Sequence, residues 1–200
     1  RMRGRPKIAL ARSYEEAMEL YQKYENNILG VITDARYPRN GVTDPMAGIK
    51  LLGEIRKRDP FVPLILESSE VSNAQYAKLY EASFVDKNSK KMNIDLREIM
   101  YDNFGFGDFI FRNPNTMEEV ARVRNLKELQ NIIFAIPKES LLYHVQRNHV
   151  SRWLYSRAMF PAAEFLKQIT WDSLQDVDGH RHVIFEAIVK YRKMKNQGVV

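Results

Sequence analysis

The chain has 200 residues, of which 44% are hydrophobic and 28% are charged, and its formal net charge is +6. These values are ordinary for a globular protein, and no apolar run reaches the roughly 18 residues of a membrane span. Cysteine is absent, which excludes disulfides, thiolate catalysis and cysteine-bound zinc. We therefore expect a cytoplasmic protein with no membrane segment.

The excess positive charge lies mostly in residues 112–200. Basic surfaces attract nucleic acid, but these basic residues are spread among leucines and aromatic residues at helical spacing. Such a pattern is typical of a solvated helical face. The sequence therefore argues against a nucleic-acid partner.

The first half of the chain alternates between strand and helix patterns. Lys7–Ala11 is a short strand candidate, and Ser13 with Glu16 forms a capping box that starts the following helix. Ile28–Thr33 is an apolar, β-branched run of the kind that forms a buried strand, and it ends in Asp34. Chemistry in open α/β sheets gathers at the carboxyl ends of such strands. Asp34 is thus the first candidate for a reactive residue.

Further strands and helices follow in the same alternation. Polar and turn residues predict a loop over 39–45. The remaining expected elements are helices over 47–58, 73–82 and 93–104 and strands over 62–66 and 84–85. The alternation predicts an α/β fold with a parallel sheet and helices on both faces.

The pattern changes after Phe104. In residues 105–111 aromatic and small residues alternate, and residues 119–123 form a second alternating stretch after a turn-rich segment. Together they predict a β-hairpin. From Asn125 onward the apolar residues keep helical spacing. We therefore divide the chain into residues 1–104, a hairpin connector over 105–124 and a helical region over 125–200.

Three residues at predicted strand ends point to a known family. Asp34 is followed by Pro38, Ser68 follows the strand over 62–66, and Lys87 ends the next strand. In this order and spacing they resemble the receiver domain of two-component response regulators. The resemblance implies a flavodoxin-like sheet in residues 1–104.

The resemblance also implies a phosphoacceptor site. Asp34 would take up a phosphoryl group as an acyl phosphate from a histidine kinase or a small phosphodonor. Lys87 would contact the phosphoryl oxygens, and the Ser68 hydroxyl would hydrogen-bond the attached group. Mg²⁺ would be held by Asp34, the backbone carbonyl of Arg36, waters and upstream carboxylates.

Those upstream carboxylates end the family's first strand, whereas this chain opens at what matches the second. We therefore expect residues 1–104 to be incomplete at the N-terminus. The first strand would lie between Lys7–Ala11 and Ile28–Thr33 in the sheet. We expect this strand to be cut away from a longer polypeptide, to be disordered or to be supplied by another molecule.

The second half of the chain carries another resemblance. Residues 104–109 and 141–154 resemble a connector in large bacterial proteins, in which receiver-like domains precede a phosphoenolpyruvate synthase-like, ATP-grasp domain. The resemblance implies a parent protein related to phosphoenolpyruvate synthase or pyruvate phosphate dikinase, with ATP bound only in that parent domain. The chain has no Gly-rich phosphate loop and no Thr-x-His phosphohistidine motif. We therefore expect this piece not to catalyse that reaction alone.

Two functional hypotheses follow; a third, a nucleic-acid-binding regulator with the helices as its output domain, would need a recognition helix that the sequence does not reveal. In the first, the chain is a regulatory and connecting part of a phosphoenolpyruvate synthase-like phosphotransferase, and its partners are a phosphodonor and the other domains of the polypeptide. In the second, it is a pseudo-receiver that serves docking or homodimerisation without phosphoryl transfer. Failure of Asp34, Ser68 and Lys87 to converge, or the lack of an upstream acidic pair, would favour the second.

The histidines suggest structural roles. His144 and His149 are five residues apart, which does not place them on one helical face. We expect them to make structural hydrogen bonds rather than to bind a metal. His180 and His182 stand beside acidic residues, and metal binding there is the less favoured interpretation.

Overall fold

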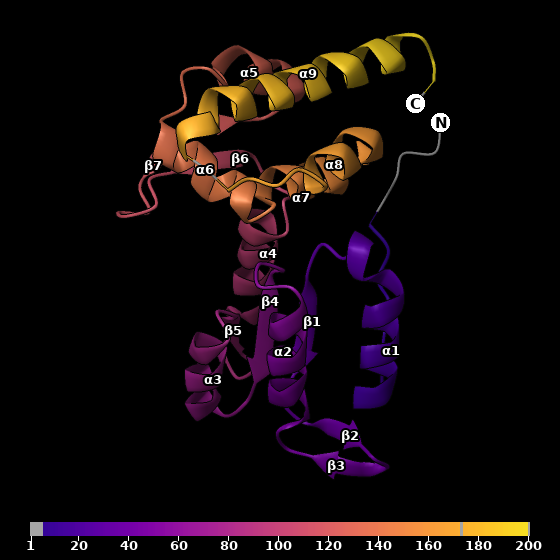
Figure 1. Cartoon of the computed structure of the whole chain (residues 1–200). Helices are drawn as coiled ribbons and strands as arrows, with labels where there is room; N and C mark the ends of the chain where they lie inside the picture. The colour runs from indigo at the N-terminus through magenta and orange to yellow at the C-terminus, as the bar shows by residue number, and fades with distance from the viewer. Residues whose placement is uncertain (1–5, 173, 200) are drawn as a thin grey trace. The chain divides into compact units, whose positions relative to one another are not determined.

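The computed structural model describes residues 6–172 and 174–199. Their contacts form two compact units, which divide in the chain between Phe104 and Gly105. The first unit is built around a parallel sheet, and the second is a hairpin with helices (Figure 1).

The first unit has an α/β fold, consistent with the flavodoxin-like class. Its sheet contains β1 (Val31–Asp34), β4 (Leu64–Ser68) and β5 (Ser83–Asp86), all parallel, in the order β1-β4-β5. In the register of the sheet, the last residue of β1 lies opposite Glu67, and the last residue of β4 lies opposite the last of β5. The carboxyl ends of the three strands therefore meet at one edge.

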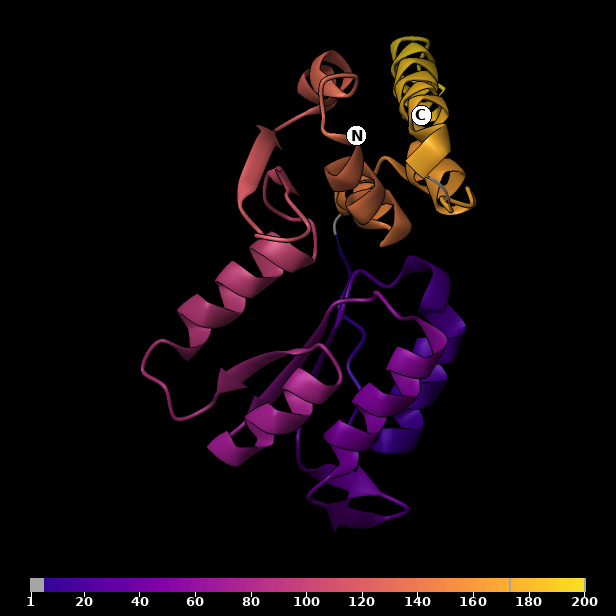
Figure 2. The same ribbon diagram turned by 60° about the vertical axis from the view of Figure 1, so that its left-hand side comes forward.

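Helices flank this sheet. They are α1 (Tyr14–Tyr24), α2 (Ala47–Arg58), α3 (Ala74–Leu79) and α4 (Met92–Asn103), with short 3₁₀ turns at Glu25–Asn27 and Val71–Asn73. Helices α1 and α2 lie side by side, and α4 packs against β5 (Figure 2). The core joins α1, α2, β4 and α3 through Tyr21, Leu52, Ile55, Leu66 and Ala77.

Local polar contacts explain where these helices begin and end. The Glu16 amide donates to the Ser13 hydroxyl at 3.2 Å, which confirms the predicted cap of α1. After α2, the Asp59 carboxylate accepts the amides of Phe61 and Val62 and turns the chain into β4. Helix α2 spans the predicted residues 47–58.

The predicted loop over 39–45 was wrong in part, because it contains a hairpin. Strands β2 (Tyr37–Arg39) and β3 (Val42–Asp44) pair in antiparallel register. Asn40 and Gly41 form the turn with φ values of 53° and 77°. An Asn-Gly pair is favoured in two-residue hairpin turns because both positions need positive φ.

The predicted strand over Lys7–Ala11 was also wrong. These residues have no regular structure, and Ile8 and Leu10 are 93% and 72% exposed. A strand requires a neighbour that accepts and donates its backbone hydrogen bonds. Among the described residues, β1 pairs with β4 alone, and no strand joins Lys7–Ala11 to its other edge.

The second unit contains the predicted hairpin and helical region. Its elements are β6 (Phe109–Arg112), β7 (Glu119–Val123), α5 (Leu126–Ile132), α6 (Lys138–Gln146), α7 (His149–Ser156), α8 (Phe160–Lys167), the 3₁₀ turn Leu174–Asp176 and α9 (Val177–Asn196). A single core joins the hairpin to the helices and includes Phe111, Trp153, Leu166 and Ile184.

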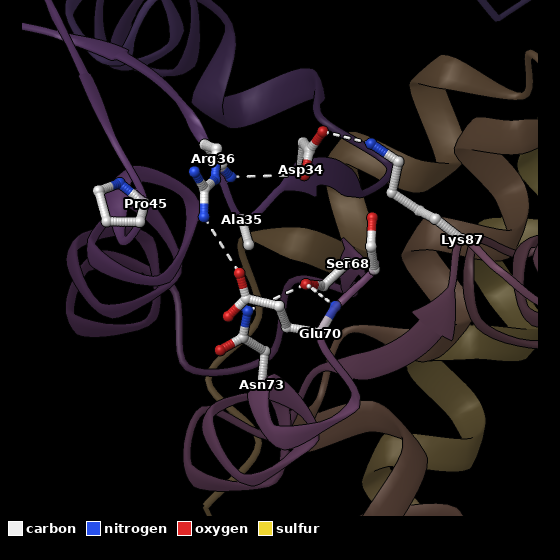
Figure 3. A pocket seen from close by; sticks show the side chains of 9 residues that line it. Asp34, Ala35, Arg36, Pro45, Ser68, Glu70, Asn73 and Lys87 are labelled. Atoms are coloured by element: carbon white, nitrogen blue, oxygen red, sulfur yellow. Dashed lines mark hydrogen bonds and ion pairs between the residues drawn. The ribbon is translucent and has the colours of Figure 1, made fainter.

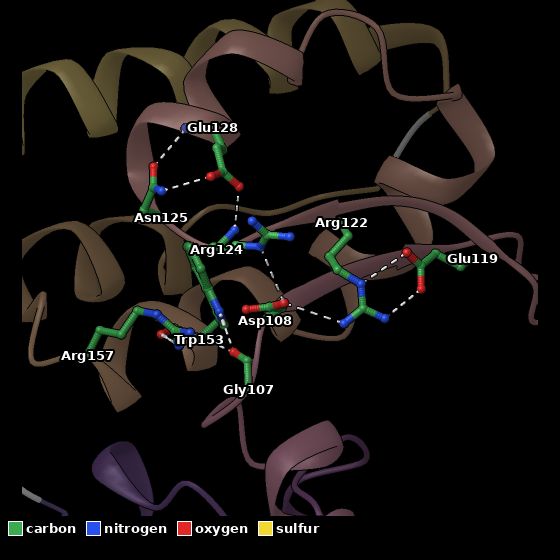
Figure 4. A network of polar contacts seen from close by, with 9 residues as sticks. All are labelled: Gly107, Asp108, Glu119, Arg122, Arg124, Asn125, Glu128, Trp153 and Arg157. Carbon is green, nitrogen blue, oxygen red and sulfur yellow. Dashed lines mark hydrogen bonds and ion pairs between the residues drawn. The ribbon is translucent and has the colours of Figure 1, made fainter.

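The first residues of this unit are fixed by α7 and the residue that follows it (Figure 4). The Arg157 guanidinium donates to the carbonyls of Gly105 and Gly107 at 2.7 and 2.6 Å, and the Trp153 indole donates to Gly107 at 3.1 Å. Gly105 has a φ of 80°, and a Cβ there would lie 3.0 Å from the Trp153 Cα. The first residues of the second unit are therefore part of its packed structure.

In neither described stretch, 6–172 or 174–199, does the structure contain a helix with the length and apolar character needed to cross a membrane.

Candidate functional site

A hollow of about 130 Å³ opens at the carboxyl edge of the parallel sheet. The strands β1 and β4 end at it, and β5 ends one residue before it. It is lined by Asp34, Ala35, Arg36, Pro45, Ser68, Ser69, Glu70, Asn73 and Lys87 (Figure 3). Residues from three separate parts of the chain thus meet at the place that the sequence indicated.

Asp34 and Lys87 form an ion pair in this hollow. Lys87 Nζ lies 2.6 Å from Asp34 Oδ2, and the two side chains are 37% and 39% exposed. The second carboxylate oxygen, Oδ1, has a longer contact of 3.4 Å to the amide of Arg36. Oδ1 is therefore the less engaged oxygen and remains open to an incoming group.

The backbone of Asp34 is held by the start of α2. The Gly48 amide donates to the carbonyl of Ala35 at 3.0 Å, and the Thr33 hydroxyl donates to the carbonyl of Asp34 at 3.0 Å. A Cβ at position 48 would lie only 1.8 Å from the Asp34 carbonyl oxygen. Only glycine allows this close approach, which fixes the place where β1 ends.

Ser68 is buried at the same edge, with 3% of its surface exposed. Its hydroxyl oxygen accepts hydrogen bonds from the Glu70 amide at 3.0 Å and from the Asn73 side chain at 2.9 Å. Neither contact uses the hydroxyl hydrogen, so Ser68 retains a donor for a ligand.

Two further contacts brace the loops around the hollow. Arg36 Nη2 lies 3.1 Å from Glu70 Oε1 and connects the segment after β1 with the loop after β4. The Asn88 side chain donates to the carbonyl of Ser69 at 2.9 Å and connects the end of β5 with that same loop. These contacts hold the three strand ends around one space.

Glu67 adds a second carboxylate beside Asp34 in the sheet register. Burial raises the pKa of Glu67 above its usual value; the Lys87 cation lowers it, and the negative charge of Asp34 adds to the rise. A cation or a hydrogen-bond donor placed at this edge would therefore be favoured electrostatically.

The donors present fit Mg²⁺ in part. Asp34 offers one accessible carboxylate, and the Arg36 backbone follows directly. In the described part of the chain, no three acidic or histidine side chains converge on one point. Mg²⁺ is commonly bound through one or two carboxylates, with waters and phosphate oxygens completing its shell.

The structure brings all three predicted side chains, Asp34, Ser68 and Lys87, to one hollow. Sequence reasoning missed the roles of Glu70, of Asn73 and of the Arg36 side chain. The available signal was their position in the loops that follow β1 and β4, the strands that end at this edge.

The histidine pair lies elsewhere, in the second unit. His144 Nε2 accepts the Arg112 amide at 2.9 Å, and His144 Nδ1 therefore donates to His149 Nδ1, which is 2.9 Å away. The two rings meet because Asn148, with a φ of 56°, interrupts the helical conformation between α6 and α7. This geometry agrees with structural hydrogen bonding.

His180 and His182 make different contacts. His180 Nε2 lies 3.7 Å from an Asp176 carboxylate oxygen, and the His182 ring contacts the Asp178 carbonyl at 2.7 Å. These contacts are local to the start of α9.

Comparison of the chain with protein-family models, with curated proteins and with solved structures found no match.

Proposed function

We propose that residues 6–104 act as a receiver-type phosphoacceptor module in which Asp34 carries the phosphoryl group. The observation that carries this proposal is the 2.6 Å pair of Asp34 with Lys87 in one hollow with Ser68. An accessible carboxylate, an ammonium and a hydroxyl donor are the groups that aspartyl phosphate chemistry needs.

In the reaction, Asp34 Oδ1 attacks the phosphorus of the donor and forms the new P–O bond. The bond from phosphorus to the leaving group breaks, and the leaving group departs with the electron pair. Lys87 then moves from the carboxylate to the phosphoryl oxygens, where its positive charge offsets the charge that develops. Water later hydrolyses the acyl phosphate and restores the Asp34 carboxylate and inorganic phosphate.

A magnesium ion bound through Asp34 and the Arg36 carbonyl would supply further neutralisation of the phosphoryl charge. The residues of this chain hold the other parts of the site. Ser68 can donate its hydroxyl hydrogen to the attached group, because its contacts with the Glu70 amide and the Asn73 side chain use only its oxygen.

We further propose that residues 105–199 connect this module to a phosphoenolpyruvate synthase-like part of the same polypeptide. The resemblance of residues 104–109 and 141–154 to such connectors supports this role. The fixed start of the second unit also suits a connector, since Gly105 and Gly107 are bound directly by Arg157.

The proposal is tested by incubating the full-length protein with acetyl phosphate and Mg²⁺ and measuring its intact mass. We expect one added phosphoryl group, which Asp34→Asn abolishes. Asp86→Asn, which changes a neighbouring carboxylate at the end of β5, should leave the modification in place. Absence of the added group, or its survival in Asp34→Asn, would refute the proposal.

A second function, docking without phosphoryl transfer, is favoured by one observation. The outer edge of β1 has no strand partner among the described residues, and Ile32 on that strand is 40% exposed. An open edge of this kind can pair with another strand. Self-association of a protein that takes up no phosphoryl group would favour this alternative.

A further inference from the structure

Two pairs of opposite charges line the hollow beside β1. Lys87 pairs with Asp34 at 2.6 Å, and Arg36 pairs with Glu70 at 3.1 Å. These four are the charged members of the nine residues that line it. The formal charges of the lining therefore cancel while Asp34 is unmodified.

Phosphorylation would disturb this balance. A phosphoryl group carries about −1.5 to −2 charges near neutral pH, and here it would replace a single carboxylate charge. Lys87 alone does not offset that charge. Arg36 is the other cation among the lining residues, and its amide already lies 3.4 Å from Asp34 Oδ1.

The contact between Arg36 and Glu70 can be exchanged easily. Their side chains point toward one another across the hollow (Figure 3), and both are more than half exposed, at 58% and 59%. An exposed ion pair favours the paired arrangement by roughly fivefold or less, so Glu70 would compete only weakly with a phosphoryl group for Arg36. A guanidinium can bind a phosphate through two parallel hydrogen bonds, which a single carboxylate contact does not match.

We propose that Arg36 is a second phosphoryl ligand, held by Glu70 in the unmodified protein. When Asp34 carries the phosphoryl group, Arg36 exchanges the Glu70 carboxylate for phosphoryl oxygens. This inference rests on the proposed function of Asp34 and adds a residue that favours a doubly charged group at the site.

The exchange also involves the loop after β4. The Glu70 amide donates to the Ser68 hydroxyl at 3.0 Å, and the same hydroxyl accepts the Asn73 side chain at 2.9 Å. Release of the Glu70 side chain therefore removes one of the contacts that hold this loop, at the time when Ser68 gains a new acceptor. Occupancy of Asp34 is in this way linked to the conformation of residues 68–73.

The test compares the rate of acyl phosphate formation from acetyl phosphate in Arg36→Gln, Glu70→Gln and the double variant. We expect Arg36→Gln to slow formation on the order of tenfold, since it removes a charged donor to the phosphoryl group. We expect Glu70→Gln to raise the rate by up to about fivefold. The double variant should match Arg36→Gln alone, because Glu70 acts through Arg36.

Glu54→Gln is the matched control, since Glu54 also forms an exposed ion pair, with Lys57 at 2.7 Å. This variant also removes one negative charge, but at a position outside the hollow, and it should leave the rate unchanged. Circular dichroism checks that each variant folds.

The outcomes separate the two proposals. If Glu70→Gln raises the rate equally with and without Arg36, Glu70 acts only through its charge and the inference is wrong. It is also wrong if Arg36→Gln reacts like the wild type while Asp34→Asn does not react. If the wild type forms no acyl phosphate that depends on Asp34, the proposed function itself fails.

Discussion

At the scale of single residues, the geometry of the site depends on a glycine outside the set that the sequence suggested. Gly48 lies in the first turn of α2 and contacts the carbonyl of Asp34 directly. Both groups are backbone, so neither can rotate away from an added side chain. The Asp34 carboxylate is thus placed by a close contact between two main-chain segments.

We predict that Gly48→Ala destabilises β1 and α2 by about 1–3 kcal/mol, the usual cost of overpacking a closed site. Its Cβ would lie 1.8 Å from the Asp34 carbonyl oxygen. Hydrogen exchange of the amides in both elements measures this free energy.

Gly53→Ala, in the same helix, is the matched control. A Cβ there would meet the tip of the Tyr80 ring at 3.1 Å, and that side chain can move. Alanine is also the better helix former by roughly 0.5–1 kcal/mol. Equal protection in the two variants would show that the contact at Gly48 is not tight.

At the scale of elements, the buried histidine pair connects α6 with α7 and with β6. Burial lowers the pKa of His144 to about 4, and the cations Arg112 and Arg147 add to the effect. The pKa of His149 is also held well below its usual value, chiefly by burial and then by His144, Arg152 and Arg147. Both rings are therefore neutral in the folded protein near pH 7.

This arrangement predicts acid sensitivity of the second unit. An unfolded histidine has a pKa of about 6.5, above the folded value, so the unfolded chain binds more protons below that pH. Stability is full above about pH 6.5 and falls as the pH drops toward 4. Between pH 7.5 and 5, His144 alone accounts for a loss of about 2 kcal/mol.

Urea unfolding followed by tryptophan fluorescence measures this loss, since both tryptophans, Trp153 and Trp171, lie in the same core. The double variant His144→Gln, His149→Asn removes both titrating rings and should show a flatter pH dependence. His182→Gln, which changes an exposed histidine, should keep the wild-type slope. An unchanged slope in the double variant would contradict the account.

The elements that could be predicted from the sequence are those with a strong local pattern. Helix α2 has apolar residues at helical spacing and ends before Asp59-Pro60, and its bounds were predicted correctly. The hairpin of β2 and β3 was missed although Asn40-Gly41 is a turn signal, because polar residues on both sides resembled a loop. Lys7–Ala11 has a strand pattern, but whether it forms a strand depends on a neighbour and not on its own residues.

At the scale of the whole molecule, the chain forms two compact units, which follow each other in the sequence. The site lies in the first unit, and its three central side chains could be predicted because parallel strands end at a common edge. The Arg36–Glu70 pair and the contact between Asn73 and Ser68 could not, since they depend on how loops are folded around that edge.

The central claim is that Asp34 is the residue that carries a phosphoryl group. Borohydride reduces an aspartyl phosphate to homoserine, so reduction after treatment with acetyl phosphate and Mg²⁺ marks the modified position. Peptide mass spectrometry of the full-length protein should find homoserine at position 34, and the mark should be lost in Lys87→Ala or become much weaker. An unmodified Asp34, or homoserine at another aspartate instead, would contradict the account.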